Sequence, residues 1–306
     1  MSRILRKSYL QSDLAAAASL LSSLPADDTH VLDRIGLESR VREAQNELGR
    51  LESRAANTGE AILFFYGAPV VEKHGIDARF SAEALKAYQD LISKQVAALL
   101  GPVGRSGPIR AEKESHLHIT NVVHGSFGFE LEEVSAPESL FESTPLAQAI
   151  EGVTTLIQAV RESDEAFADV AAGTDGRVYD ALREFLSTIH KAGAAFRVVS
   201  EIGEVAFDAE SLATATERAS AQRTEIGDQP LPGTFLGVLL DSRRFEHRVL
   251  ETGEVVRGRV ADNVDVRDLL RWTDRPCVAH LQVITLARGS RELRRYTLLR
   301  LTEAQG

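Results

Sequence analysis

Five strand-length apolar segments follow one another after residue 230, and a single short helical pattern interrupts them. In chain order the segments are GTFLGVLL, RFEHRVLE, EVVRGRV, CVAHLQVITL and RRYTLLRL. The helical pattern, Val264 to Trp272, lies between the third and the fourth segment. This order is typical of a small Greek-key β-barrel of the oligonucleotide/oligosaccharide-binding (OB-like) type, and an SH3-like barrel is the competing prediction. The polar, Pro- and Gly-bearing stretch RTEIGDQPLPG before them indicates a linker, which places the barrel at residues 230–306.

The N-terminal region repeats apolar residues at alternating steps of four and three, which is the spacing of a helical stripe. The first stripe is Leu10, Leu14, Ala17, Leu21 and Leu24, and the second is Leu37, Val41, Ala44, Leu48, Leu51 and Ala55. Pro25 and Asp28 separate them, so residues 1–57 are predicted to form a helical hairpin or short coiled coil. Because so short a coil is marginal alone, we expect the second stripe to pack on a partner chain or on the rest of the fold. Packing on a partner chain would make the protein a homo-oligomer, with Leu37, Val41, Leu48 and Leu51 at the oligomer interface.

Residues 58–229 mix strand and helix patterns. AILFFYGAPV is a continuous apolar run that predicts a central strand, and a helical pattern follows from Ser81 until Gly101-Pro102. Residues 115–134 predict a β-hairpin, and residues 145–222 are largely helical, with a first helix to about Ala171 and two short strands about Gly203. We therefore predict an α+β fold with a helical middle region and a C-terminal barrel.

Charge is unevenly distributed along the chain. The net charge of −10 argues against nonspecific coating of nucleic acid, but residues 230–306 carry 13 Arg and 10 acidic residues and are mildly basic. Arginine favours planar partners such as carboxylate or phosphate. The residues predicted to bind nucleic acid or a protein partner on the barrel are Arg243, Arg244, Arg257, Arg259 and Trp272. Acidic residues interleave with them, so a mixed-charge solvated surface is the alternative.

Apolar runs and cysteine content limit the class of protein. The longest apolar run, Ala61 to Phe65, is strand-sized, and the N-terminal segment shows no secretory signal pattern. We therefore expect a cytoplasmic protein without a membrane partner. Cys277 is the only cysteine, which excludes an intramolecular disulfide, and its apolar context predicts a core residue. We predict no cofactor.

The segment HLHITNVVHGSFGFELEE, residues 116–133, carries the most suggestive chemistry. A three-residue loop at 124–126 would pair Val123 with Phe127, Asn121 with Phe129 and Ile119 with Leu131. One face would then hold His116 and His118 opposite Glu130 and Glu132, four candidate catalytic residues. Two histidines at i and i+2 on a strand can share a metal with a facing carboxylate, so His116, His118 and Glu132 are the candidate ligands of a divalent metal. A solvated His/Glu face is the alternative.

Familiar catalytic motifs do not occur in the sequence. GPVGRSGP is glycine-rich but lacks the Lys-Ser/Thr ending of a phosphate loop, and Gly-x-Ser-x-Gly and His-Glu-x-x-His are both missing. Part of the chain resembles uncharacterised bacterial proteins of about this size, over roughly residues 60–135. The residues that carry this resemblance are Phe65-x-Gly67-x-Pro69-Val70, Gly75-Ile76, Phe80, Tyr88-Gln89, Gly125-Ser126-Phe127-Gly128-Phe129 and Leu131-Glu132-Glu133. The resemblance implies a bacterial protein and brings no activity with it.

The sequence favours a non-enzymatic, self-associating binding or assembly protein that uses the barrel as its recognition module. One alternative is a metal-dependent hydrolase or nuclease that uses the His/Glu face of the hairpin. Another is a regulator or effector of bacterial conflict, such as phage defence.

Overall fold

The computed structural model describes residues 3–25, 30–53, 58–72, 74–101, 115–123, 127–134, 143–288 and 290–304. The chain divides into two compact units. The sheet unit comprises Met1–Gln158 and Asp175–Thr214, and the barrel unit comprises Ala159–Thr174 and Ala215–Gly306. None of the helices in these described ranges is both long enough and apolar enough to cross a membrane.

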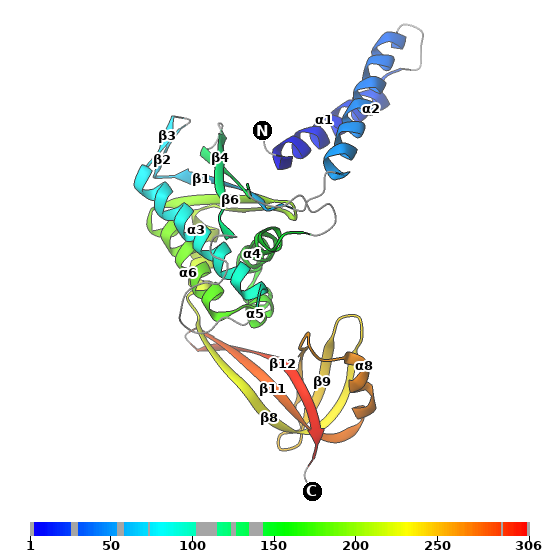
Figure 1. Cartoon of the computed structure of the whole chain (residues 1–306), viewed down its shortest axis with the longest axis vertical. Coiled ribbons are helices and arrows are strands. Elements are labelled where there is room, and N and C mark those ends of the chain that lie inside the picture. The colour runs from blue at the N-terminus through cyan, green and yellow to red at the C-terminus, as the bar shows by residue number, and fades with distance from the viewer. Residues whose placement is uncertain are drawn as a thin grey trace. The chain divides into compact units, whose positions relative to one another are not determined.

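Helices α1 (Arg3–Ser23) and α2 (Val31–Ser53) form an antiparallel hairpin at the start of the sheet unit (Figure 1). Leu10 of α1 is buried with Ala44 and Leu48 of α2, and Leu14 and Leu51 pack around them. The two apolar stripes therefore pack on each other within one chain, and the predicted helical hairpin is confirmed. Ion pairs Arg6–Glu47 and Asp13–Arg40 also join the two helices.

An antiparallel sheet in the order β4-β5-β1-β6-β7 forms the centre of the sheet unit. Its strands are β1 (Glu60–Gly67), β4 (His118–Val123), β5 (Phe127–Glu132), β6 (Ala194–Ser200) and β7 (Gly203–Phe207). The apolar run at 61–65 forms the middle strand and is buried throughout, as the sequence predicts. A small hairpin of β2 (Val70–Val71) and β3 (Gly75–Ile76) follows β1.

Helices α3 (Ala78–Leu99) and α6 (Gly176–Lys191) pack together and meet one face of this sheet. The Phe65 ring lies 5.3 Å from Phe80 of α3, and Phe185 of α6 lies 5.2 Å from Phe196. On the other face, Ile4 of α1 packs against Ile62 and Phe64. Strand alternation explains this division, because successive side chains of β1 point to opposite faces.

The remaining helices are α4 (Pro145–Glu162), α5 (Asp164–Ala172) and α7 (Ala209–Ala219). The single helix expected from Pro145 to about Ala171 is wrong, since the chain breaks at Ser163. The Ser163 side chain accepts a hydrogen bond from Ala166 N–H and caps a new helix, α5.

The barrel unit contains a closed barrel of five strands in the order β10-β12-β11-β8-β9, which confirms the predicted small barrel (Figure 1). The strands are β8 (Gln222–Leu239), β9 (Arg244–Val249), β10 (Val255–Val260), β11 (Arg275–Arg288) and β12 (Arg291–Glu303). Helix α8 (Val266–Leu269) and the 3₁₀ turn Leu270–Trp272 lie between β10 and β11, where the helical pattern is. The stretch RTEIGDQPLPG is not a linker, because it forms the first part of β8 and pairs with β11.

Two glycines allow the barrel strands to approach closely. A Cβ on Gly233 would lie 2.0 Å from the carbonyl oxygen of Arg248, and one on Gly258 would lie 2.1 Å from that of Tyr296. The barrel interior is filled by aliphatic side chains with Phe235, Phe245 and Cys277. Cys277 is buried in the barrel core, as the sequence predicts. This burial raises the pKa of its thiol, which therefore stays protonated.

Candidate functional site: an arginine face on the barrel

Strands β9 and β10 divide their side chains strictly between the interior and the exterior of the barrel. Phe245, His247 and Val249 of β9 are buried, and the residues between them are exposed. Val256 and Val260 of β10 are likewise buried. The exposed charged side chains of the two strands are Arg244, Glu246, Arg248, Arg257 and Arg259. We call this set the arginine face, and it places four guanidinium groups beside one carboxylate.

The strand register determines which charges of the arginine face are compensated. Arg257 pairs with Glu246 across the strands, with 2.7 Å between Nε and Oε1. Arg259 lies directly opposite Arg244, whose guanidinium is 4.0 Å from Asp169 of α5. Like charges directly opposite each other on a sheet are destabilising. The face therefore carries an electrostatic cost that an anionic ligand would relieve.

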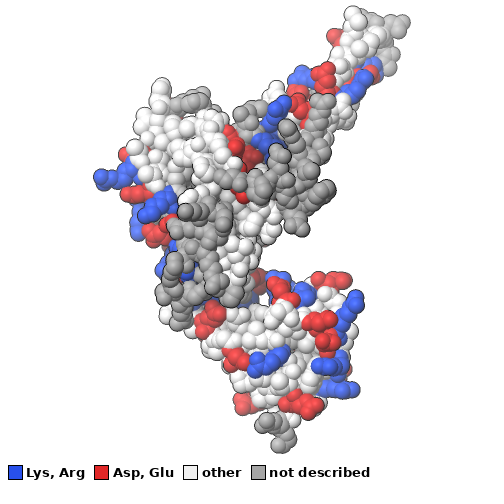
Figure 2. All heavy atoms as spheres, viewed as in Figure 1, with Lys and Arg blue, Asp and Glu red and all other residues white. Residues whose placement is uncertain are grey.

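Arg248 and Arg259 make no ion pair with any residue that the structure describes, and both are exposed. Their guanidinium groups are consequently available to carboxylate or phosphate groups, which arginine binds with two parallel hydrogen bonds. Figure 2 shows basic and acidic atoms side by side over the barrel.

Two of the predicted partner-binding residues lie apart from the arginine face. Arg243 has a positive φ of 52° and donates hydrogen bonds to the carbonyl oxygens of Ala261 (2.7 Å) and Val264 (2.9 Å), which stabilises a loop. Trp272 is partly buried against the barrel core. The sequence predicts all five residues as one binding surface because arginine and tryptophan side chains can bind nucleic acid or a protein partner. In the structure only Arg244, Arg257 and Arg259 share a face.

Exposed apolar side chains of the barrel are aliphatic throughout its described residues: Ile226, Leu239, Leu240, Leu250 and Leu270. Barrels that bind single-stranded nucleic acid stack the bases on exposed aromatic rings. Within the part of the barrel that the structure describes, the two aromatic rings that are not fully buried, Trp272 and Tyr296, are partly buried against the core.

A polar cluster lies on the ribbon that β8, β11 and β12 form. His280 Nδ1 is 2.8 Å from Asp228 Oδ1, and Arg300 is 2.7 Å from Asp228 Oδ2. The hydrogen bond from His280, followed by that from Arg300, holds the pKa of the Asp228 carboxyl below its usual value. These residues compensate one another, so we assign them a structural role in the ribbon.

The predicted His/Glu hairpin is present, but its register differs from the prediction. His118 faces Glu132 and Ile119 faces Leu131, as expected. A bulge at Thr120 then shifts the pairing, so that Asn121 faces Glu130 and Val123 faces Gly128, not Phe129 and Phe127. The bulge is an extra residue that interrupts strict alternation. The loop at 124–126 lies outside the described residues.

The four candidate catalytic residues of the hairpin lie in different environments. His116 and His118 are exposed, whereas Glu130 is buried and Glu132 is half-buried. Among the described residues, the groups close enough together to hold a metal ion are Glu60, Glu130 and Glu132. Sequence reasoning missed Glu60 because it lies on β1 and joins the hairpin only through the sheet.

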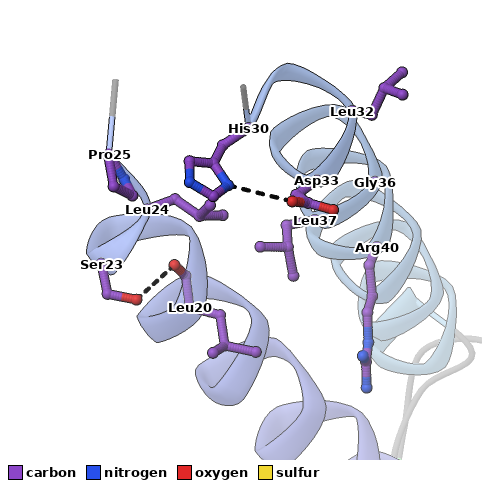
Figure 3. Close-up of a pocket in the computed structure, with 10 residues that line it drawn as sticks. All are labelled: Leu20, Ser23, Leu24, Pro25, His30, Leu32, Asp33, Gly36, Leu37 and Arg40. Atoms are coloured by element: carbon purple, nitrogen blue, oxygen red, sulfur yellow. Dashed lines mark hydrogen bonds and ion pairs between the residues drawn. The ribbon is translucent and has the colours of Figure 1, made fainter. Parts of the chain in front are cut away.

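The free end of the α1–α2 hairpin forms an apolar hollow (Figure 3). Leu20, Leu24 and Leu37 line it, and His30 lies 3.4 Å from Asp33 at its edge. Leu32 of the lining is 83% exposed, and Ile35 nearby on α2 is 56% exposed. Large aliphatic side chains this exposed on one helix are typical of a protein-contact surface.

Of the four residues predicted to lie at an oligomer interface, Leu48 is buried inside the hairpin and Leu51 packs beside it. Leu37 lines the hollow, and Val41 is half-buried. The prediction of an oligomer stays a prediction.

Comparisons with protein-family models, with curated proteins and with solved structures found no match to this chain. Function must therefore be inferred from the arrangement of the residues themselves.

Proposed function

We propose that this chain is a non-enzymatic binding and assembly protein whose barrel is of the OB type and binds an acidic protein segment on the arginine face. The OB assignment is supported by the cyclic strand order β8-β9-β10-β12-β11 and by the helix between the third and fourth strands. The second and third strands of OB barrels provide their usual binding surface. In this chain those strands are β9 and β10, which carry the arginine face.

The observation that carries the proposal is the uncompensated charge of this face. Arg248 and Arg259 make no ion pair within the described residues, and Arg259 faces Arg244 across the strands. A carboxylate between two such guanidinium groups would accept hydrogen bonds from both and would cancel their repulsion. An acidic protein segment is favoured over single-stranded nucleic acid because the exposed apolar side chains of the described barrel are aliphatic, whereas Trp272 and Tyr296 are partly buried against the core.

The test uses the full chain and two fluorescein-labelled probes, a 12-residue peptide of Asp, Glu and Ser and a 20-nucleotide oligo-dT. Fluorescence anisotropy should show binding of the peptide that weakens with salt. Arg257→Glu combined with Arg259→Glu should weaken binding about tenfold or more, because two charge-assisted contacts become repulsive.

The matched control is Arg267→Glu combined with Arg294→Glu, which changes the net charge equally at exposed sites away from the face. The control should keep the affinity of the wild type. Equal losses in both variants would refute the arginine face as the binding site. Tighter binding of the oligo-dT, with the same sensitivity to Arg257 and Arg259, would replace the acidic segment by nucleic acid.

Self-association through the free end of the α1–α2 hairpin is the assembly part of the proposal. Its support is the exposure of Leu20, Leu32 and Ile35, at 54%, 83% and 56%. Burying three such side chains against a second copy would contribute about 1.5–3 kcal/mol each.

A metal-dependent hydrolase or nuclease is the second candidate function. The observation in its favour is that Glu130 and Glu132, two of its four expected residues, lie beside a third carboxylate, Glu60. The test is Mn²⁺-dependent cleavage of single-stranded DNA by the wild type and by Glu130→Gln. Cleavage that persists in the variant would exclude these carboxylates from catalysis.

A further inference from the structure

Three carboxylates converge on the face of the sheet that contacts the start of α1. Glu60 of β1 is paired with Glu132 of β5, and Glu130 is paired with Ile62, so all three glutamates point to the same face. One oxygen atom from each carboxylate lies within 4.8 Å of the other two. Such a cluster alone does not define a binding site, since exposed acidic groups often lie together.

Burial distinguishes this cluster from an ordinary acidic surface. Glu130 is only 2% exposed and Glu60 is 7% exposed. The Glu130 Oε1 atom is buried and has no hydrogen-bond partner among the residues that the structure describes. A buried carboxylate without a partner is strongly disfavoured, and it needs a proton or a cation for compensation.

The apolar surroundings of the cluster make this requirement stricter. Ile4, Ile62 and Phe64 form a buried group on the same face of the sheet. Side chains of this kind exclude water, and Coulomb interactions are stronger where water is excluded. Repulsion among the three carboxylates is therefore poorly screened.

The cations nearby compensate the cluster only in part. Arg3 of α1 lies 3.6 Å from Glu60 but is closer to Glu201, at 2.9 Å. Lys7 also pairs with Glu201, at 3.6 Å. The Ile4 N–H at the start of α1 donates to Glu60 over 3.4 Å. Arg3 and Lys7 thus pair with Glu60 and Glu201, whereas Glu130 and Glu132 make no ion pair with any residue that the structure describes.

We propose that Glu60, Glu130 and Glu132 bind one hard divalent cation of the size of Ca²⁺, which joins β1 to β5 beneath the start of α1. Two missing positive charges correspond to one divalent ion. Oxygen-only ligands select hard cations over Zn²⁺.

The number of carboxylates favours Ca²⁺ over Mg²⁺. Ca²⁺ accepts several carboxylates in flexible geometry, whereas Mg²⁺ demands near-ideal octahedral geometry and is usually bound through one or two carboxylates with retained waters. Three carboxylates whose oxygen atoms lie within 4.8 Å of one another therefore suit Ca²⁺ better. The half-buried Glu132 leaves a side through which water molecules can complete the shell.

The test is titration of the full, chelator-treated chain with CaCl₂ in a calorimeter at pH 7.5. One ion per chain is expected for the wild type, and Glu130→Gln should lose the binding, because the amide keeps the shape of the side chain but removes its charge. Glu204→Gln is the matched control, since Glu204 lies on β7 of the same sheet and pairs with Arg197 outside the cluster. His118→Ala should bind like the wild type, which separates this site from the one that the sequence predicts.

Thermal unfolding provides a second measurement that does not depend on the titration. A Ca²⁺ concentration of about 100 times Kd should raise the Tm of the wild type by about 5–10 °C and leave that of Glu130→Gln unchanged. In chelator, Glu130→Gln should be the more stable of the two proteins, because the uncompensated buried charge is gone. A wild type that binds no Ca²⁺, or a variant that still binds it, would overturn the proposal. Mg²⁺ binding tighter than Ca²⁺ would overturn the assignment of the ion.

This site is independent of the arginine face, so either proposal can fail alone.

Discussion

Acidification from pH 7.5 to 5.5 is expected to destabilise the barrel through one residue, His247. The ring is fully buried, and its Nε2 atom lies 3.0 Å from the carbonyl oxygen of Leu231, which accepts a hydrogen bond from Nε2–H. The Nδ1 atom is buried without a partner among the described residues. Burial lowers the pKa of His247 below its ordinary value, and the hydrogen bond to Leu231 opposes this effect only in part.

The sign of the effect follows from the two protonation states. The folded barrel holds a neutral imidazole, whereas the unfolded chain takes up a proton below about pH 6.5. The contribution of neutral His247 to the free energy of unfolding is therefore complete above that pH. It is lost as the pH falls toward the lowered pKa of His247 in the folded state. Each pH unit in this window costs about 1.4 kcal/mol, so the loss at pH 5.5 is at most about 1.4 kcal/mol.

Urea unfolding followed by tryptophan fluorescence measures this loss in the barrel alone. Trp272 is the only tryptophan of the chain and packs against the barrel core, so its emission reports on that unit. The free energy of unfolding of a small domain falls by about 1 kcal/mol per M of urea. The urea concentration at the midpoint of unfolding should therefore be lower at pH 5.5 by up to about 1.4 M. His247→Gln removes the titrating group and keeps an N–H donor. This variant should be less stable at pH 7.5 but should show almost the same midpoint at both pH values.

Persistence of the full acid effect in His247→Gln would refute the reasoning, because the proton would then bind elsewhere. A wild-type midpoint that does not change with pH would refute it as well.

Three further predictions concern packing. Gly233→Ala should destabilise the barrel by about 2–4 kcal/mol, because its Cβ would meet the Arg248 carbonyl at 2.0 Å; Gly227→Ala, with open space around it, is the control in the same urea assay. Tyr88→Phe should stabilise the sheet unit by about 1 kcal/mol, because the buried Tyr88 hydroxyl has no partner among the described residues; a loss in calorimetric Tm would reveal a partner. Leu32→Glu combined with Ile35→Glu should give a monomer in light scattering and leave the helix content measured by circular dichroism unchanged. Leu48→Glu should reduce the helix content, because Leu48 is buried inside the hairpin. A monomeric wild type would refute self-association.

The elements whose side chains alternate between a core and water could be predicted from the sequence. The five barrel strands and the α1–α2 hairpin have one buried face each, and the period of two or of 3.6 residues is visible in the sequence. The stretch that became the first part of β8 has both faces exposed, so it shows no such period and resembles a linker. Only backbone pairing with β11 makes it a strand.

The candidate sites depend on contacts between residues far apart in the chain. The bulge at Thr120 has no residue signature of its own, and it shifted half of the predicted hairpin register. Glu60 joins Glu130 and Glu132 because β1 pairs with β5, which the sequence of the hairpin alone does not reveal. On the barrel, three of the five predicted residues share a face because Arg244 lies on β9 and Arg257 and Arg259 on β10, at exposed positions of adjacent strands.

The barrel unit is assembled from two separate stretches of chain, with part of the sheet unit between them. Helix α5 belongs to the first stretch, and its Asp169 meets Arg295 of β12 at 2.5 Å. During synthesis α5 therefore leaves the ribosome long before the strand that it packs against, and the barrel cannot close until β12 has also emerged. A gene fragment that starts at residue 230 would lack both α5 and the first part of β8. Circular permutation or a fused copy of residues 159–174 is consequently the way to obtain this barrel as an independent molecule.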